Sequence, residues 1–299
     1  MTIGAPSRSL RRLATAIATS AVVTLVASGI SSAQASEPPS PSPSVHMTPE
    51  LHARIQKKVH EFRATHGAPG IAVAVVTPNA SGPGSEITTF AAGVPEIGSP
   101  TPVDAATQFE LGSETKVFTA DLLSALVAEG RVSLDDPVQW YAPAGITVPE
   151  WTENGASTPI TLRDLATHQA GLPDMPANLE RGCDGVPDCV NPRPGYTQKM
   201  LWNALQDQTL LWQPGTNWLY SDWGFGLLGT ILSNIVDPVP ENDPPAFASA
   251  LDTTFLAPLG MTSTTLEAPS PRLAVPYAGD PLAATWYWDN TNALSGAEG

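Results

Sequence analysis

The chain has 299 residues and is 42% hydrophobic, which is enough to bury one sizeable core, or one core with a smaller lobe. Its formal net charge of −15 at pH 7 is repelled by phosphate backbones, which argues against nucleic acid as a partner. Two cysteines supply too few thiolates for a zinc site, and the sequence indicates no metal or organic cofactor.

The N-terminal segment has the pattern of an export signal. Three arginines precede an uncharged stretch at 13–30, and Ala-Gln-Ala at 33–35 matches the small-x-small pattern that signal peptidase cleaves. An uncleaved membrane anchor is the alternative interpretation of this weakly apolar stretch. We expect a signal peptide over 1–35, a Pro/Ser-rich linker over 36–48 and a folded domain over 49–299, in a secreted or periplasmic protein without a stable membrane span.

The folded domain is predicted to begin with a helix and a hairpin. Apolar residues recur at helical spacing from Leu51 to Phe62, and Gly67 is placed to end that helix. Residues 70–76 are a short, β-branched apolar run typical of a buried strand, and residues 87–92 can return beside it.

Helices dominate the middle of the chain. A long helix is expected from Ser113 to Glu129, with Gly130 as its stop signal. A short helix with a Thr-x-x-Asp capping pair is expected over 161–167. Further helices are expected over 223–235 and 246–256.

The two cysteines, Cys183 and Cys189, lie close together in the sequence. In an oxidising compartment such a pair is predicted to close a small surface loop as a disulfide.

The candidate chemistry begins with Ser113-Glu114-Thr115-Lys116. A hydroxyl is a weak nucleophile until its proton is removed, and a lysine three positions along a helix lies on the same face and can reach it. The helix N-terminus also favours negative charge near Ser113. Taken alone, the tetrad supports equally well an N-cap serine followed by a surface lysine.

The surroundings of this tetrad resemble the serine β-lactamase and penicillin-binding-protein superfamily, in particular its class C β-lactamase and DD-peptidase branch. The resembling blocks occur in family order at 109–120 (FELGSETKVFTA), 126–138, 160–173, 213–216 with 220–229, and 258–261. The resemblance implies an α/β (α+β) fold of the β-lactamase/transpeptidase type, with an antiparallel sheet flanked by helices and a helical subdomain. It implies a serine hydrolase with Ser113 as nucleophile and Lys116 as its activating amine.

The family's second motif, Tyr-x-Asn, is matched at Tyr220-Ser221-Asp222. The resemblance implies that Tyr220 shuttles the nucleophile's proton and that position 222 binds substrate. Asp222 replaces the usual asparagine, which removes an amide donor and adds a negative charge that favours the charged form of Lys116. This departure weakens the case for β-lactam turnover more than the case for acylation. The alternative for Tyr220 is a packed core tyrosine.

His168 suggests a Ser-His-Asp triad, but two observations argue against that reading. The resembling block gives this histidine a structural place near a helix end. The Gly-x-Ser-x-Gly elbow of the α/β-hydrolases is also missing from the sequence.

The family's third motif, Lys-Thr-Gly or His-x-Gly, supplies a cation and one oxyanion-hole N–H. It does not follow Tyr220, because the last lysine is Lys199 and the last histidine is His168. We therefore expect that the closing C-terminal strands are missing, either from a fragment of a longer enzyme or from a natural short form. Loss of one such donor costs about 10²–10³ in rate, so we expect the 299 residues alone to be inactive.

The predicted substrates are small peptides, esters or β-lactams, with D-Ala-D-Ala peptides of peptidoglycan as the first choice. A β-lactamase or esterase of the same fold is the nearest alternative. A binding protein that keeps the fold without turnover is the alternative from another class.

Overall fold

The computed structural model describes residues 46–79, 84–185, 191–266, 272–278, 283–284 and 291–298. The predicted signal peptide and most of the predicted linker lie outside these residues. Within the described ranges, no helix is both long enough and apolar enough to cross a membrane.

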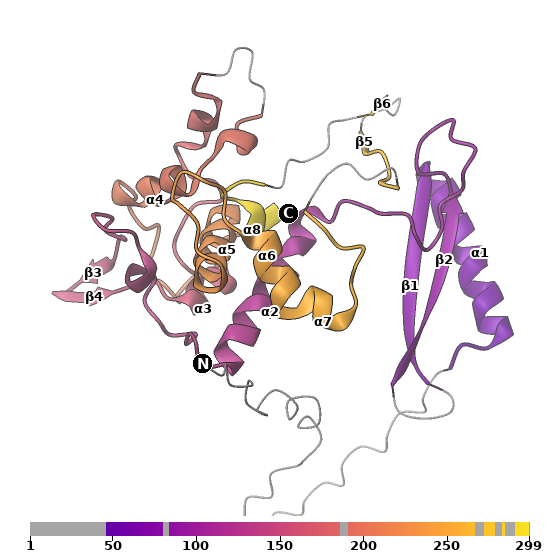
Figure 1. Ribbon diagram of the computed structural model, residues 1–299, viewed down its shortest axis with the longest axis horizontal. Coiled ribbons are helices and arrows are strands. Elements are labelled where there is room, and N and C mark those ends of the chain that lie inside the picture. Colours follow the sequence, from indigo (N-terminus) through magenta and orange to yellow (C-terminus); the bar gives the residue numbers. More distant parts are fainter. Residues whose placement is uncertain are drawn as a thin grey trace, which may run out of the picture. The chain divides into compact units, whose positions relative to one another are not determined.

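The first described elements are α1 (Pro49–His66), β1 (Gly70–Pro78) and β2 (Ser85–Gly93). α1 ends at Gly67, whose φ of 64° lies in the left-handed region that glycine adopts without strain. β1 and β2 pair antiparallel and α1 lies along them (Figure 1). Burial of Val59, Phe90 and Ala92 gives this segment a small core of its own. The predicted helix and hairpin are confirmed.

The predicted long helix forms as a 3-10 turn (Gly112–Glu114) that continues into α2 (Thr115–Ala128). It ends with Gly130 at φ 69°, as the sequence predicted. Its apolar face includes Leu122 and Leu126, which are fully buried in the main core.

α5 (Asp222–Val236) is deeply buried, and residues 222–233 are buried without interruption. Its glycines have a packing reason, because α5 lies against α8 (Ser295–Glu298) at very short range. A Cβ built on Gly229 would lie 2.6 Å from the Cα of Gly296, so only glycine permits this approach.

The short helix predicted over 161–167 is present as α3 (Leu162–Ala166). Thr161 and Asp164 form the predicted capping pair, and each side chain accepts a hydrogen bond from the backbone N–H of the other. The helix predicted over 246–256 is present as α6 (Phe247–Leu251) followed by a π-helical turn (Asp252–Leu256), and α7 (Ala257–Leu259) continues beyond the predicted range.

Two hairpins and a helix were not predicted. β3 (Trp151–Glu153) and β4 (Ala156–Thr158) form a hairpin around Asn154-Gly155, both at positive φ. This Asn-Gly pair is the usual signal for a two-residue hairpin turn.

α4 (Gln198–Gln206) is capped by Thr197 and buries Leu201, Trp202 and Leu205. The remaining strands, β5 (Tyr277–Ala278) and β6 (Ala283–Ala284), pair antiparallel.

Candidate functional site

Ser113 lies in the 3-10 turn that opens into α2, and it is exposed. Neither the turn nor α2 has a side-chain cap, so Ser113 is not the capping serine of the alternative interpretation. Its Oγ lies 2.6 Å from the Tyr220 hydroxyl and 3.2 Å from the Lys116 Nζ. The structure thus brings together the three groups that the sequence singled out as candidates.

Lys116 is buried, with 8% of its surface exposed. Its Nζ donates to the Asp222 carboxylate at 2.5 Å, to the Tyr220 hydroxyl at 2.6 Å and to the carbonyl oxygen of Ala297 at 2.8 Å. Asp222 and Ala297 offer oxygens that only accept, so they occupy two N–H groups. The remaining position on the nitrogen faces Tyr220 and Ser113.

Tyr220 directly precedes the N-cap residue of α5. The hydrogen bonds at this start of the helix fix the direction of the chain at Tyr220. Ser221 is the N-cap residue, and its Oγ accepts from the Gly224 N–H at 2.9 Å while donating to the Pro173 carbonyl at 2.7 Å. The Asp174 carboxylate accepts from the Asp222 N–H at 3.2 Å. The loop that follows α3 therefore holds the start of α5 in place.

Asp222 is as buried as Lys116, with 9% of each side chain exposed. Its carboxylate is engaged in the ion pair with Lys116. An ion pair at this depth is costly to form and costly to break, because either charge alone would lack water. The expected role of Asp222 in substrate binding stays a prediction.

α8 adds contacts that the sequence did not reveal. Besides the Ala297 carbonyl at Lys116, the Gly296 carbonyl accepts from the Thr119 hydroxyl on α2 at 2.6 Å. The buried Glu298 carboxylate forms an ion pair with the partly buried Arg193. Burial raises the pKa of the Glu298 carboxyl, and Arg193 opposes that shift. Backbone carbonyls carry no residue-specific signal, so only the folded chain could identify these partners.

His168 is placed against Tyr220 rather than against the candidate nucleophile. Its Nδ1 accepts from the Ser221 N–H at 3.0 Å, so this nitrogen is not directed at Ser113. This arrangement agrees with a structural place for His168 and argues against a Ser-His-Asp triad.

Cys183 is disulfide-bonded. Its predicted partner, Cys189, lies outside the described residues, so the pairing itself stays a prediction. Across the ranges that the structure describes, no group of three or more His, Cys, Asp or Glu side chains is arranged to hold a metal ion.

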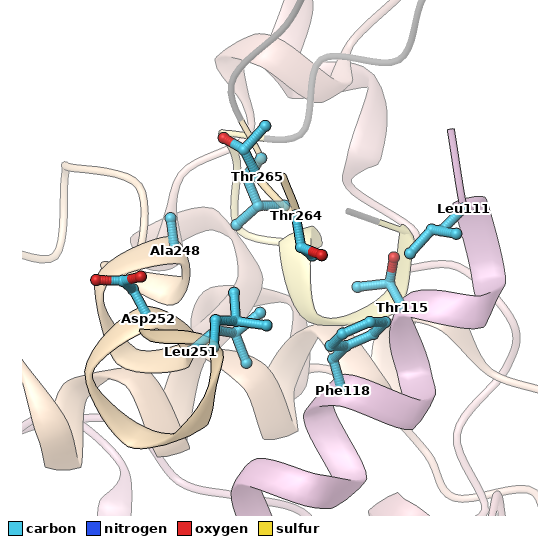
Figure 2. Close-up of a pocket in the computed structure, with 10 residues that line it drawn as sticks. Leu111, Thr115, Phe118, Ala248, Leu251, Asp252, Thr264 and Thr265 are labelled. Carbon is cyan, nitrogen blue, oxygen red and sulfur yellow. The ribbon is translucent and has the colours of Figure 1, made fainter. Parts of the chain in front are cut away.

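A cavity of about 180 Å³ lies on another side of α2. Figure 2 shows Leu111, Thr115 and Phe118 on one wall and Leu251 with Asp252 on the other. Ser113, Lys116 and Tyr220 do not line this cavity, so it is distinct from the polar site.

Comparisons with known proteins identify the family of the chain and its fold. A family model described as Beta-lactamase matches residues 55–299. The chain is 36% identical over 162 residues to the D-alanyl-D-alanine-carboxypeptidase/endopeptidase AmpH of Escherichia coli (strain K12), a match covering 54% of this chain and 37% of that protein. It is 32% identical over 201 residues to a Beta-lactamase of the same organism, covering 67% of this chain and 44% of that protein.

Solved structures show the same fold. The crystal structure of a beta-lactamase/D-alanine carboxypeptidase from Yersinia pestis, complexed with citrate, is similar with a TM-score of 0.59 and 26% identity. The similarity covers 75% of this chain and 59% of that one. A class C beta-lactamase is similar with a TM-score of 0.61 at 23% identity. The chain spans less than half the length of the two Escherichia coli proteins.

Proposed function

The chain belongs to the beta-lactamase family, and from that premise we propose that it is an exported serine hydrolase that forms an acyl-enzyme at Ser113. One observation carries the proposal. The exposed hydroxyl of Ser113 lies within hydrogen-bond reach of both the Tyr220 phenol and the buried Lys116 nitrogen, at 2.6 and 3.2 Å. A nucleophile beside a proton carrier that is itself held by a third group is the arrangement that nucleophilic catalysis needs.

The proposed step is acyl transfer to Ser113. Its Oγ bonds to the carbonyl carbon of an amide or ester, and its proton passes to the Tyr220 oxygen, which has first given its own proton to the third position of the Lys116 nitrogen. The ammonium of Lys116 stabilises negative charge on the phenol oxygen, and Asp222 balances the ammonium. The C–N or C–O bond to the leaving group then breaks, and the leaving atom takes the proton from Tyr220. Water releases the acyl group in a second round of the same proton transfers.

Tyr220 suits the relay because its oxygen contacts both other groups. The Lys116 nitrogen donates to Asp222 and Ala297 in both of its forms. Its third position, which faces Tyr220 and Ser113, can then carry either an N–H or a lone pair. A proton can thus move among Ser113, Tyr220 and Lys116 without a change of hydrogen-bond partners. This preorganisation supports a chemical role over a merely structural one.

For the substrate we propose the D-Ala-D-Ala ends of cell-wall peptides. The AmpH relative is named a D-alanyl-D-alanine-carboxypeptidase/endopeptidase, and an exported protein meets such peptides. β-Lactam turnover or esterase activity is the alternative within the fold, supported by the relative named Beta-lactamase. A binding protein without turnover is favoured by Asp222, whose carboxylate is already paired with Lys116.

The first experiment is covalent labelling of the full chain by a fluorescent penicillin, with the labelled peptide identified by mass spectrometry. We expect label on Ser113 and at least about 10³-fold slower labelling of Ser113→Ala. Ser124→Ala is the matched control, because Ser124 lies exposed on the same helix, and it should label like the unchanged chain. Equal labelling of Ser113→Ala and the unchanged chain would reject the proposal.

Substrate class is tested by three assays on the same preparation. Release of D-alanine from a peptide ending in D-Ala-D-Ala indicates a peptidase, nitrocefin hydrolysis a β-lactamase, and hydrolysis of a p-nitrophenyl ester an esterase. Binding of penicillin that is unchanged by Ser113→Ala, without any product, would identify the non-catalytic alternative.

A further inference from the structure

His168 holds the backbone on both sides of Tyr220. The Leu219 N–H donates to the His168 carbonyl oxygen at 3.0 Å, and the Ser221 N–H donates to the His168 Nδ1 at 3.0 Å. The residues before and after Tyr220 are therefore fixed by one residue that lies more than fifty positions earlier in the chain.

The His168 ring also packs on the ring that carries the phenol. Their centroids are 4.8 Å apart with an angle of 28° between the planes, which is a stacked arrangement. Phe225 packs on the imidazole at 4.9 Å and Trp218 meets it edge-on at 5.7 Å. Tyr220 thus cannot rotate away from Ser113 without losing its contact with this aromatic group.

The backbone of His168 has an uncommon conformation at the place where it holds Tyr220. Its φ of 58° is in the left-handed region, which residues other than glycine adopt uncommonly, although asparagine, aspartate and histidine do so more often than the rest. Departures of this kind persist where the surrounding contacts require them, and they cluster at functional sites.

The contacts also fix the protonation of the ring. Because Nδ1 accepts from an N–H, it carries no proton, and the neutral ring holds its proton on Nε2. Burial and the charge of Lys116 lower the pKa of His168 below its ordinary value of 6.5, while Asp222 and Asp174 act in the opposite direction. The neutral, accepting ring is therefore the form favoured at neutral pH.

We propose that His168 is the positioning residue of Tyr220, and that its neutral imidazole keeps the phenol within reach of Ser113 and Lys116. The proposal rests on the acyl-transfer function proposed above. Protonation of Nδ1 would place a donor against the Ser221 N–H and remove that bond. Acylation should therefore fall when His168 gains a proton, although His168 touches no reacting atom.

Two substitutions separate the hydrogen bond from the ring contact. His168→Asn keeps an acceptor in place of Nδ1, tolerates the left-handed backbone and does not titrate. His168→Phe keeps the stacked ring and removes the acceptor. His60→Asn is the matched control, since His60 is exposed on α1.

The measurement is the rate of labelling by fluorescent penicillin between about pH 5 and pH 8. In the unchanged chain, labelling should slow only at pH values well below the ordinary histidine pKa of 6.5, because the pKa of His168 is lowered. His168→Phe should label about 10- to 100-fold more slowly at every pH, because the phenol is displaced. His168→Asn should lose no more than about tenfold and should lack the slowing at acid pH. The penicillin concentration giving half-maximal rate should stay unchanged in both.

Identical rates and pH profiles for the unchanged chain and both variants would overturn the proposal, as would an acid slowing that persists in His168→Asn. If His168→Phe does not fold, the pH profile of His168→Asn decides alone. A nitrogen NMR spectrum gives a readout independent of activity, and a proton on Nδ1 at neutral pH would also overturn the assignment. Failure of Ser113 to label in the unchanged chain would reject the proposed function instead, and the NMR result would still decide the placement of His168.

Discussion

In the α1–β1–β2 segment, a helix packs on the hairpin that follows it directly in the chain, and three apolar side chains form the core. In the α2–α5–α8 segment, the decisive contacts join distant positions, such as Lys116 with Tyr220 and with Ala297. The same types of residue behave differently in the two places. Lys58 and Glu61 pair at 2.8 Å on the surface of α1, whereas Lys116 and Asp222 pair at 2.5 Å in the interior.

The two ion pairs differ in their exposure to water. Water can replace either partner of the surface pair, so that pair contributes little to stability. No water can replace the partners of Lys116, so each one matters for both stability and chemistry. The five predictions that follow test this contrast, starting with the largest effect.

Lys116→Met should have the largest effect. It leaves the Asp222 carboxylate buried without a partner and should lower the free energy of unfolding by about 3–5 kcal/mol. It should also slow penicillin labelling by about 10²–10⁴, since the proton relay loses its charged member. The double variant Lys116→Met/Asp222→Leu should regain stability in urea unfolding but not labelling. Recovery of labelling in the double variant would show that Lys116 has only a structural role.

Phe90→Ala should destabilise the other segment by about 3–5 kcal/mol, because Phe90 is fully buried in its small core. All eight tryptophans lie at or after Trp140, so none of them belongs to this segment. Hydrogen exchange of the β1 and β2 amides should speed up at lower urea than the fluorescence change. Coincident transitions would mean that the two segments unfold as one. Ile87→Ala, at an exposed position of the same strand, is the control.

Gly229→Ala should separate α5 from α8 and cost about 1–3 kcal/mol, because its methyl group would overlap the backbone of Gly296. The Ala297 carbonyl would then move away from Lys116, so labelling of Ser113 should also slow. Gly260→Ala is an informative control, since nothing lies within 4 Å of that position and only its left-handed φ is strained. A normal labelling rate in Gly229→Ala would show that α8 does not position the lysine.

Glu298→Gln should change how stability depends on pH. The raised pKa means that the folded chain keeps this proton at pH values where the unfolded chain, with a pKa near 4.5, has released it. Stability should therefore fall as the pH rises above about 4.5, and Glu298→Gln should flatten that slope in thermal melts. Glu61→Gln should remove a pH dependence of the opposite sign. Lys58 lowers the pKa of Glu61, so the stability that the ionised Glu61 contributes is lost as the pH falls.

Lys58→Met should have the smallest effect, since its surface pair with Glu61 is open to water. We expect the melting midpoint to change by less than about 1 °C. A loss comparable to that of Lys116→Met would contradict the contrast between the two lysine–carboxylate pairs.

The sequence alone determined the elements that depend on neighbouring residues. The spacing of apolar residues and the stop at Gly67 predicted α1, and the Thr161–Asp164 pair predicted the cap of α3. Ser113, Lys116 and Tyr220 could be selected because their motifs are short and stand among resembling blocks. Periodicity, capping and turn signals act over a few residues, which is why they can be read without a fold.

Only the tertiary structure decided how the site is assembled. It placed the Ala297 carbonyl at Lys116, showed that the expected charge of Asp222 is buried in an ion pair with Lys116, and set His168 on Tyr220. These partners lie far apart in the chain, and Ala297 acts through a backbone atom that every residue possesses. Their roles follow from burial and distance, which exist only once the helices have packed.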